Sequence, residues 1–288
     1  MQYFYLITAT FLSASTGIIG GMYNSRTKGK KTAVPLYNFI ILSSVFILWL
    51  VMFIIDGRYN FSVLWYSALF ALFYSVCNVS LIKALKEGSV ILTSLLLQLS
   101  LIAVSVWGLI FWGARFSVLV LAGLVMAIVS VALCLYKKEN GKLDINFKWL
   151  IFALLAFAGN AGCCIVQRTQ QMAFNGKYGD FLMMAATGLS AIVCGVIYFT
   201  GDKEGSKLII AKAGLYPVIA GICNVPLNLF VIFLATSSIS PSLIYPVISV
   251  GGIAITIVFS ALVFKEKMNL WQWFGLFLGA VATGLLSI

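Results

Sequence analysis

The stretch KKENGKLDINFK, residues 137–148, divides this chain of 288 residues into two apolar halves, residues 1–136 and 149–288. Hydrophobic residues make up 62% of the chain and charged residues only 9%. A soluble domain carries about 45–50% apolar and about 25% charged residues. A soluble globule of this size would need far more polar surface. The composition therefore predicts an integral membrane protein that crosses the bilayer several times, joined at its middle by a short polar linker.

Five apolar runs lie in each half, and each is long enough to cross a hydrocarbon core of about 30 Å at about 1.5 Å per residue. Inside lipid the backbone must satisfy its own hydrogen bonds, so runs of this length form helices. The predicted fold class is all-α, with ten transmembrane helices. We expect them at residues 2–23, 34–55, 61–84, 89–112, 116–136, 149–170, 180–200, 214–236, 240–264 and 269–288.

The two halves resemble each other in sequence. WLIFA at 149–153 echoes YLITA at 5–9, and Asn78 aligns with Asn228. Apolar runs also resemble one another through composition alone, but these features sit at corresponding places in the helices and favour a true repeat. Because five is odd, the second half must enter the membrane upside down relative to the first. The sequence thus predicts two inverted five-helix repeats, a plan by which many transporters build related gates around a midplane site.

Basic residues are unevenly divided between the two predicted sides of the membrane. Of the 19 lysines and arginines, 15 lie in the connections that follow odd-numbered runs. The other side holds Arg58, Arg115, Arg168 and Lys177. The positive-inside rule therefore places the odd connections in the cytoplasm and both termini outside. The net charge of +11 fits basic loops beside anionic lipid and predicts no nucleic-acid partner.

The types of residue in the chain exclude several chemistries. There is no histidine, and the eight acidic residues all fall at the ends of apolar runs or between them. The six cysteines have no zinc-ligand spacing and are interpreted as reduced and structural. There is no Walker motif for ATP. We predict no enzyme activity, no metal and no cofactor, and transport by facilitated movement or exchange. Proton coupling would need Asp180, another carboxylate at a helix end, or a titratable group on the substrate itself.

A transporter must offer its substrate polar groups near the membrane midplane, where polar side chains are costly unless partnered. Asn224 and Asn228 bracket Pro226 on one helix face, and Tyr74 and Asn78 share a face in the same way. The candidate substrate-binding residues are Asn160, Asn224, Asn228, Gln98, Asn78, Tyr74, Ser15, Thr16, Tyr245 and Arg168. For each amide the alternative is a helix–helix hydrogen bond of about 1 kcal/mol, and for the tyrosines it is packing.

Arg168 has two alternatives. An arginine near a helix end usually extends its charge to the lipid headgroups. Turned inward beside Gln167, Gln170 and Gln171, it would instead hold a substrate carboxylate or phosphate.

Two prolines, Pro226 and Pro246, interrupt predicted helices. Each removes a backbone donor and frees a carbonyl that can face a cavity or be paired by a neighbour. Gly275 and Gly279 put small side chains on one face of the last helix, which lets helices approach closely. Close packing alone accounts for these residues equally well.

Three segments of the second half resemble the closing part of an EamA-type repeat of the drug/metabolite transporter superfamily. They are SSISPSLIYPVISVGG at 237–252, VFKEKM at 263–268 and WFGLFLGAVATG at 273–284. The family shows a serine-rich helix start, a proline within the helix, a Gly-Glu turn and a glycine-spaced last helix. The first half repeats the pattern more weakly as ALKEGS at 84–89 and WGARF at 112–116. The resemblance covers essentially the whole chain.

The sequence departs from this family in two places. Glu266 matches the turn glutamate, but Lys265 stands where the family has glycine, and Ala114 takes the glutamate's place in the first half. Ten-helix relatives are usually drawn with both termini in the cytoplasm, which is opposite to the orientation from the charge count.

The resemblance implies a secondary transporter in a bacterial plasma membrane. It implies export of a small organic metabolite such as an amino acid, by alternating access at a midplane cavity between the repeats. Nucleotide-sugars, purines or drugs are alternative substrates of the same fold, and a lipid-handling membrane protein is the alternative from another class. The expected partners are the small-molecule substrate and membrane lipids, and both a monomer and a homodimer are compatible with the sequence.

Overall fold

The computed structural model describes residues 2–27, 30–88, 90–112, 117–135, 138–139, 142–143, 146–235, 237, 241–263 and 269–285. These residues form α1 (Gln2–Thr27), α2 (Ala33–Asp56), α3 (Val63–Glu87), α4 (Val90–Phe111), α5 (Val118–Leu135), β1 (Lys138–Glu139), β2 (Lys142–Leu143), α6 (Phe147–Ala173), α7 (Gly179–Thr200), α8 (Ser206–Ala213), α9 (Leu215–Ala235), α10 (Pro241–Val263) and α11 (Leu270–Leu285). The prediction of a helical protein is confirmed over this part of the chain, apart from one hairpin of two-residue strands.

Six of the described helices, α1, α2, α3, α6, α7 and α9, are long and apolar enough to cross a membrane. Large apolar side chains cover their outer surfaces: Ile54 is 69% exposed, Trp65 is 73% exposed and Ile192 is 66% exposed. Contiguous apolar surface of this kind is unfavourable in water and favourable against lipid tails. The structure is that of an integral membrane protein.

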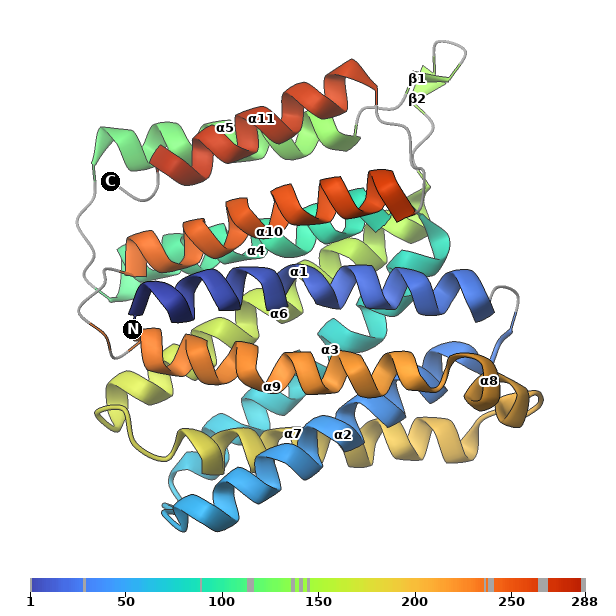
Figure 1. The fold of residues 1–288 in the computed structure, drawn as a ribbon. Helices are drawn as coiled ribbons and strands as arrows, with labels where there is room; N and C mark the ends of the chain where they lie inside the picture. The colour runs from blue at the N-terminus through green and yellow to red at the C-terminus, as the bar shows by residue number, and fades with distance from the viewer. Residues whose placement is uncertain are drawn as a thin grey trace.

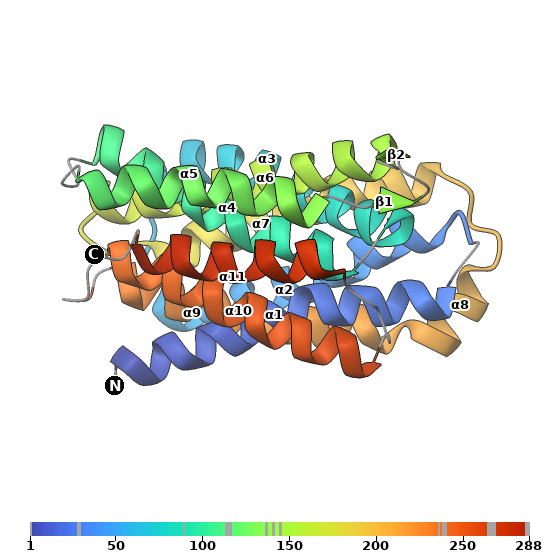
Figure 2. The ribbon, with the colours of Figure 1, turned by 90° about the horizontal axis from the view of Figure 1, so that it is seen from above.

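The long helices run between the same two ends of the molecule (Figures 1 and 2). The pair α5 and α11 lies along one side of the bundle, and the pair α2 and α7 lies along the opposite side. Between them, α3 packs against α6, α1 against α9, and α4 against α10. Two further contacts, of α1 with α10 and of α4 with α6, close the middle of the bundle.

Helices approach closely in the bundle where one of them carries a small residue. A Cβ atom added to Gly159 of α6 would lie 2.8 Å from the backbone nitrogen of Cys77 and 2.8 Å from the backbone oxygen of Phe73 in α3. Ser130 of α5 donates a hydrogen bond of 2.6 Å to the backbone oxygen of Gly275 in α11. Because lipid supplies no hydrophobic drive for helices to associate, close contacts and interhelical hydrogen bonds of this kind hold the bundle together.

The end of the bundle at which α1 ends and α2 begins is tied together by polar contacts between connections. Thr32 donates to the backbone oxygen of Glu204 at 3.0 Å. Asn146 caps α6 and donates to the backbone oxygen of Glu87 at 2.9 Å. This end carries Arg26, Lys30, Lys31, Lys83, Lys86, Lys148, Lys203, Lys207 and Lys212, and we call it the basic end.

The opposite end carries an ion pair between Arg58 and Asp56, in which Arg58 Nε donates to Asp56 Oδ1 at 2.7 Å. This hydrogen bond raises the pKa of the Arg58 guanidinium above its usual value.

Two elements differ from the sequence-based prediction. The connection predicted between runs seven and eight contains α8, an amphipathic helix of eight residues that is too short to cross a bilayer. It begins after Gly205, whose φ of +76° favours glycine. The polar linker contains β1 and β2, paired antiparallel between Lys138 and Leu143. Glu266, Lys265 and Ala114 lie outside the described residues.

We predict that Gly159→Ala destabilises the protein by about 1–3 kcal/mol, because the new methyl group meets backbone atoms of α3 that cannot move independently of the helix. Thermal unfolding in detergent measures the effect. Gly284→Ala in α11 is the matched control, since a Cβ there meets nothing within 4 Å. Equal melting temperatures for the two variants would contradict this account of the α3–α6 contact.

Candidate functional site

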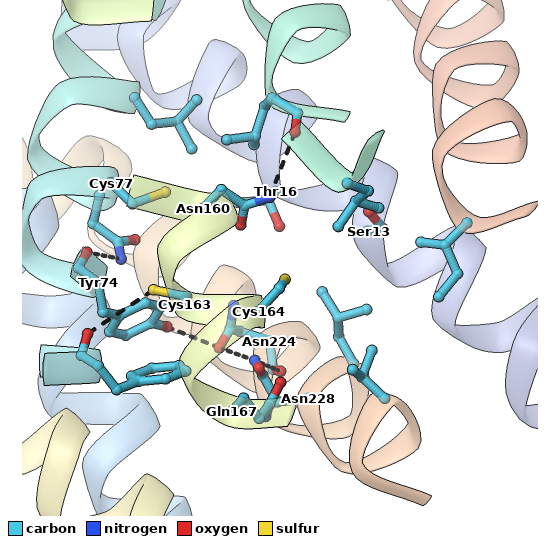
Figure 3. Close-up of a pocket in the computed structure, with 18 of the residues that line it drawn as sticks. Ser13, Thr16, Tyr74, Cys77, Asn160, Cys163, Cys164, Gln167, Asn224 and Asn228 are labelled. Atoms are coloured by element: carbon cyan, nitrogen blue, oxygen red, sulfur yellow. Dashed lines mark hydrogen bonds between the residues drawn. The ribbon is translucent and has the colours of Figure 1, made fainter. Parts of the chain in front are cut away.

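A cavity of about 100 Å³ lies in the middle of the bundle, between α1, α3, α4, α6, α9 and α10 (Figure 3). Three of these helices line it with residues at the spacing of a single helix face. These positions are 74, 77, 78 and 81 on α3, 160, 163, 164 and 167 on α6, and 224, 227, 228 and 231 on α9. Pockets for drug-sized ligands are typically about 300–1,000 Å³, so this volume suits a small metabolite.

A chain of hydrogen bonds joins α3 to α9 along one wall of the cavity. The Tyr74 hydroxyl donates to Asn224 Oδ1 at 2.8 Å, and Asn228 Nδ2 donates to the same oxygen at 3.0 Å. One turn after Tyr74, Asn78 Nδ2 donates to the backbone oxygen of Tyr74 at 2.8 Å. Figure 3 shows the row of side chains running from Tyr74 through Asn224 to Asn228. The two midplane pairs that the sequence predicted separately therefore form one network.

A second polar group lies at Asn160 of α6. Asn160 Nδ2 donates to Ser100 Oγ of α4 at 2.7 Å, while Ser100 itself donates to the backbone oxygen of Leu97. Thr16 of α1 also lines the cavity (Figure 3). Asn160 therefore does both things considered for it from the sequence. It makes a helix–helix hydrogen bond, and it faces the cavity.

The cavity presents hydrogen-bond acceptors. Asn78, Asn160 and Asn228 each use Nδ2 on a protein oxygen, which leaves their Oδ1 atoms without a partner among the described residues. The side chains that line the cavity in the described part of the chain include no carboxylate, lysine or arginine. A ligand that matches this lining brings N–H or O–H donors and no net charge that would need a counter-ion here.

Arg168 lies beside the cavity on the side away from the basic end. Its guanidinium stacks on the ring of Trp112 with Cζ 5.0 Å from the centroid, and it contacts the hydroxyl of Tyr245, a residue of the cavity wall. Nε and Nη1 of Arg168 are buried and have no hydrogen-bond partner among the described residues. The side chain therefore adopts the inward alternative, and its two buried donors can receive an anionic group.

Other predicted residues have different positions. Ser15 lies on α1 but does not line the cavity, and its hydroxyl donates to the backbone oxygen of Leu12, one turn earlier. Pro226 lies inside α9, between Asn224 and Asn228. Gly275 and Gly279 lie on the face of α11 that meets Ser130 of α5, far from the cavity. The side chains of Gln98 and Pro246 lie outside the described residues.

Sequence reasoning missed the thiols and one amide of the cavity wall. Cys77, Cys163, Cys164 and Gln167 face the cavity together with Ser13. The signal that could have found three of them is their spacing from Asn160, at three, four and seven residues along one helix face. The thiols are free, and the described residues include no cluster of histidine, cysteine or acidic side chains that could hold a metal ion.

Comparison with known proteins defines the fold and nothing further. No protein-family model matches the chain, and no curated protein matches it. A solved structure described only as "Crystal structure of protein" is similar over 96% of this chain and 95% of its own, with a TM-score of 0.62 and 13% sequence identity. At that identity the likeness establishes a shared helical fold across the whole chain.

We predict that Tyr74→Phe lowers the free energy of unfolding by about 0.5–1.5 kcal/mol, since it removes one hydrogen bond and leaves Asn224 Oδ1 with its donor from Asn228. Tyr66→Phe is the matched control on the same helix, because the Tyr66 hydroxyl makes no hydrogen bond to a described residue. Thermal unfolding of both variants in detergent is the measurement. If Tyr66→Phe lowers the free energy of unfolding as much as Tyr74→Phe does, the hydrogen bond between α3 and α9 makes no specific contribution to stability.

Proposed function

We propose that this protein is a secondary transporter of a small zwitterionic metabolite such as an amino acid. In this proposal ten transmembrane helices form two inverted five-helix repeats, residues 1–136 and 149–288, and the central cavity opens alternately to the two sides. The observation that carries the proposal is the cavity itself: its walls come from both halves, its lining offers acceptor oxygens, and a guanidinium with two unpaired nitrogens lies beside it.

The packing of the helices supports the inverted repeat. If α1 to α5 correspond to α6, α7, α9, α10 and α11, then each major contact between the halves has a counterpart. The contact of α3 with α6 corresponds to that of α9 with α1, and the contact of α3 with α7 to that of α9 with α2. The contact of α1 with α10 corresponds to that of α6 with α4. The pairs α2–α7, α4–α10 and α5–α11 correspond to themselves, as helices beside a two-fold axis do.

The lining of the cavity follows the same correspondence. Its six helices are three matched pairs, α1 with α6, α3 with α9, and α4 with α10. Asn78 aligns with Asn228, so Tyr74 corresponds to Asn224, and these two residues hydrogen-bond to each other. A site on the axis between inverted repeats is where two related gates can close on a substrate from either side.

The distribution of donors and acceptors favours a zwitterion. The free amide oxygens of Asn78, Asn160 and Asn228 suit an ammonium group, which has three donors and no acceptor. The unpaired Nε and Nη1 of Arg168 suit a carboxylate, which accepts two parallel hydrogen bonds. An α-amino acid with an uncharged side chain carries both groups on the same carbon and has no net charge.

The mechanism of energy coupling follows from the neutral lining. Proton-coupled transport needs a titratable group that meets both proton and substrate, and the described lining holds no carboxylate. We therefore favour exchange or facilitated movement of the substrate.

The resemblance to EamA-type transporters of the drug/metabolite superfamily supports export across a bacterial plasma membrane. The charge count favours a cytoplasmic basic end, with both termini outside. Nucleotide-sugars, purines and drugs remain alternative substrates, and a lipid-handling protein remains the alternative from another class.

We expect an amino acid to raise the melting temperature of the detergent-purified protein in a panel that also includes nucleobases, nucleotide-sugars and cationic drugs. Asn160→Ala and Asn224→Ala each remove a side chain from the cavity wall and should abolish the shift. Asn60→Ala, in the connection between α2 and α3, is the matched control. A panel in which only lipids stabilise the protein would favour the lipid-handling alternative.

We expect Arg168→Gln to weaken binding of the stabilising amino acid by about 10–100-fold, the range of a charged hydrogen-bond partner. The same variant should not change binding of the corresponding amine that lacks the carboxylate. Arg58→Gln, at the same end of the bundle but exposed, is the matched control. Equal weakening of the amino acid and the amine would show that Arg168 supports the structure of the cavity and does not bind the carboxylate.

A further inference from the structure

A second and larger pocket, of about 410 Å³, lies at the basic end. It is formed by the start of α2, the end of α3, the start of α6 and the end of α7. Its polar residues include Lys31, Lys83, Lys86 and Asn38, and it does not share a residue with the central cavity.

The second pocket and the central cavity lie on opposite faces of α3. Positions 74, 78 and 81 face the cavity, whereas positions 79, 83 and 86 face the second pocket. Since successive residues turn by about 100° around a helix, the two sets point about 140° apart. A molecule in the second pocket is therefore separated from the proposed substrate by the body of α3. It occupies the periphery of the bundle, where lipid is the surrounding solvent.

The pocket is positively charged. Three lysines face one carboxylate, that of Glu87, and no ion pair joins Glu87 to any of them among the described residues. Lys83 lies over the ring of Phe152, with Nζ 5.1 Å from the centroid. Lysine ammonium groups held together without a counter-ion attract an anion, and phosphate is the anion that they commonly bind in proteins.

Asn38 provides an independent sign of a ligand. Its side chain is 1% exposed and lines the pocket. Nδ2 donates to the backbone oxygen of Val34 at 3.0 Å, while Oδ1 is buried without a partner among the described residues. A buried acceptor without a partner costs about 1–3 kcal/mol. A donor from a bound molecule, such as a hydroxyl group, would remove that cost.

The remaining walls are apolar and reach the outer surface. Val34, Pro35, Val79 and Phe152 line the pocket, and Ile197 at its edge is 46% exposed. An amphipathic ligand fits such a pocket better than a free phosphate, because its acyl chains continue along the apolar surface of the helices. Basic pockets between transmembrane helices are the usual sites for anionic lipid headgroups.

We propose that this pocket binds the headgroup of an anionic phospholipid with free hydroxyl groups, of the phosphatidylglycerol type. The phosphate lies among Lys31, Lys83 and Lys86, and a glycerol hydroxyl donates to Asn38 Oδ1. The bound lipid joins α2 and α7 to α3 and α6 at the basic end. This binding is independent of what the central cavity carries.

Native mass spectrometry of the detergent-purified full chain, titrated with phosphatidylglycerol, tests the proposal. The unaltered protein should retain phosphatidylglycerol in preference to phosphatidylcholine. Lys83→Gln combined with Lys86→Gln should weaken that binding about twenty-five-fold, because each lysine beside an anionic lipid contributes a factor of about five. Lys207→Gln combined with Lys212→Gln is the matched control, since it removes the same charge from the same end outside the pocket. This control should leave the binding unchanged.

Two further measurements separate the possible outcomes. Asn38→Leu should remove the preference for phosphatidylglycerol over phosphatidylethanol, an anionic lipid without headgroup hydroxyls. If the first double variant does not fold, Lys31→Gln should weaken binding about five-fold. Equal losses in the two double variants would assign the effect to net charge and overturn the proposal. No preference over phosphatidylcholine, or binding of glycerol 3-phosphate with the same affinity as the lipid, would also overturn it.

Discussion

Lipid cannot hydrogen-bond to the polypeptide backbone, and the rest of this structure depends on that constraint. Each long segment must satisfy its own N–H and C=O groups, so it forms a helix. Side-chain polar groups face the same demand and bond to the backbone or to a neighbouring helix. Ser190 of α7, for example, donates to the backbone oxygen of Ala71 in α3 at 3.1 Å. Because association gains nothing from excluding water, helices meet where a small residue such as Gly159 permits close contact.

In the central cavity this pairing of polar groups is incomplete. The amide nitrogens are used within the protein, whereas oxygens of Asn78, Asn160 and Asn228 and two nitrogens of Arg168 are left over. The leftover groups are complementary, acceptors in the cavity and donors beside it, and they lie between helices from both halves. The pocket at the basic end also contains groups without partners. Its three lysines give it excess positive charge, and one buried amide oxygen there accepts no hydrogen bond. Both sites are recognised by what the protein itself leaves unpaired.

Most helix positions could be predicted from the sequence because the length of an apolar run is a local property. The predicted run 34–55 became Ala33–Asp56, and the run 180–200 became Gly179–Thr200. Midplane depth is also local, and Asn160 and Asn224, chosen by depth, both line the cavity. Rotation about the helix axis is not local, and of the two neighbours Ser15 and Thr16, which lie at the same depth, only Thr16 lines the cavity. The sequence did not predict Cys163 and Cys164 in the cavity wall for the same reason, because an apolar thiol does not indicate which face of the helix it lies on.

The sequence by itself determined that this chain is an integral membrane protein, approximately where its long helices lie, and which end of the bundle is basic. Those properties depend on composition and on run length, which require no knowledge of neighbours. Only the tertiary structure decided which polar groups meet. The hydrogen bond from Tyr74 to Asn224 joins residues 150 positions apart. Arg168 turns inward, where its guanidinium stacks on Trp112 and contacts the hydroxyl of Tyr245. Asn38 Oδ1 is buried among four helix ends, none of which supplies it with a donor in the described part of the chain. Each outcome depends on how helices pack side by side, and hydropathy along a single helix does not encode that arrangement.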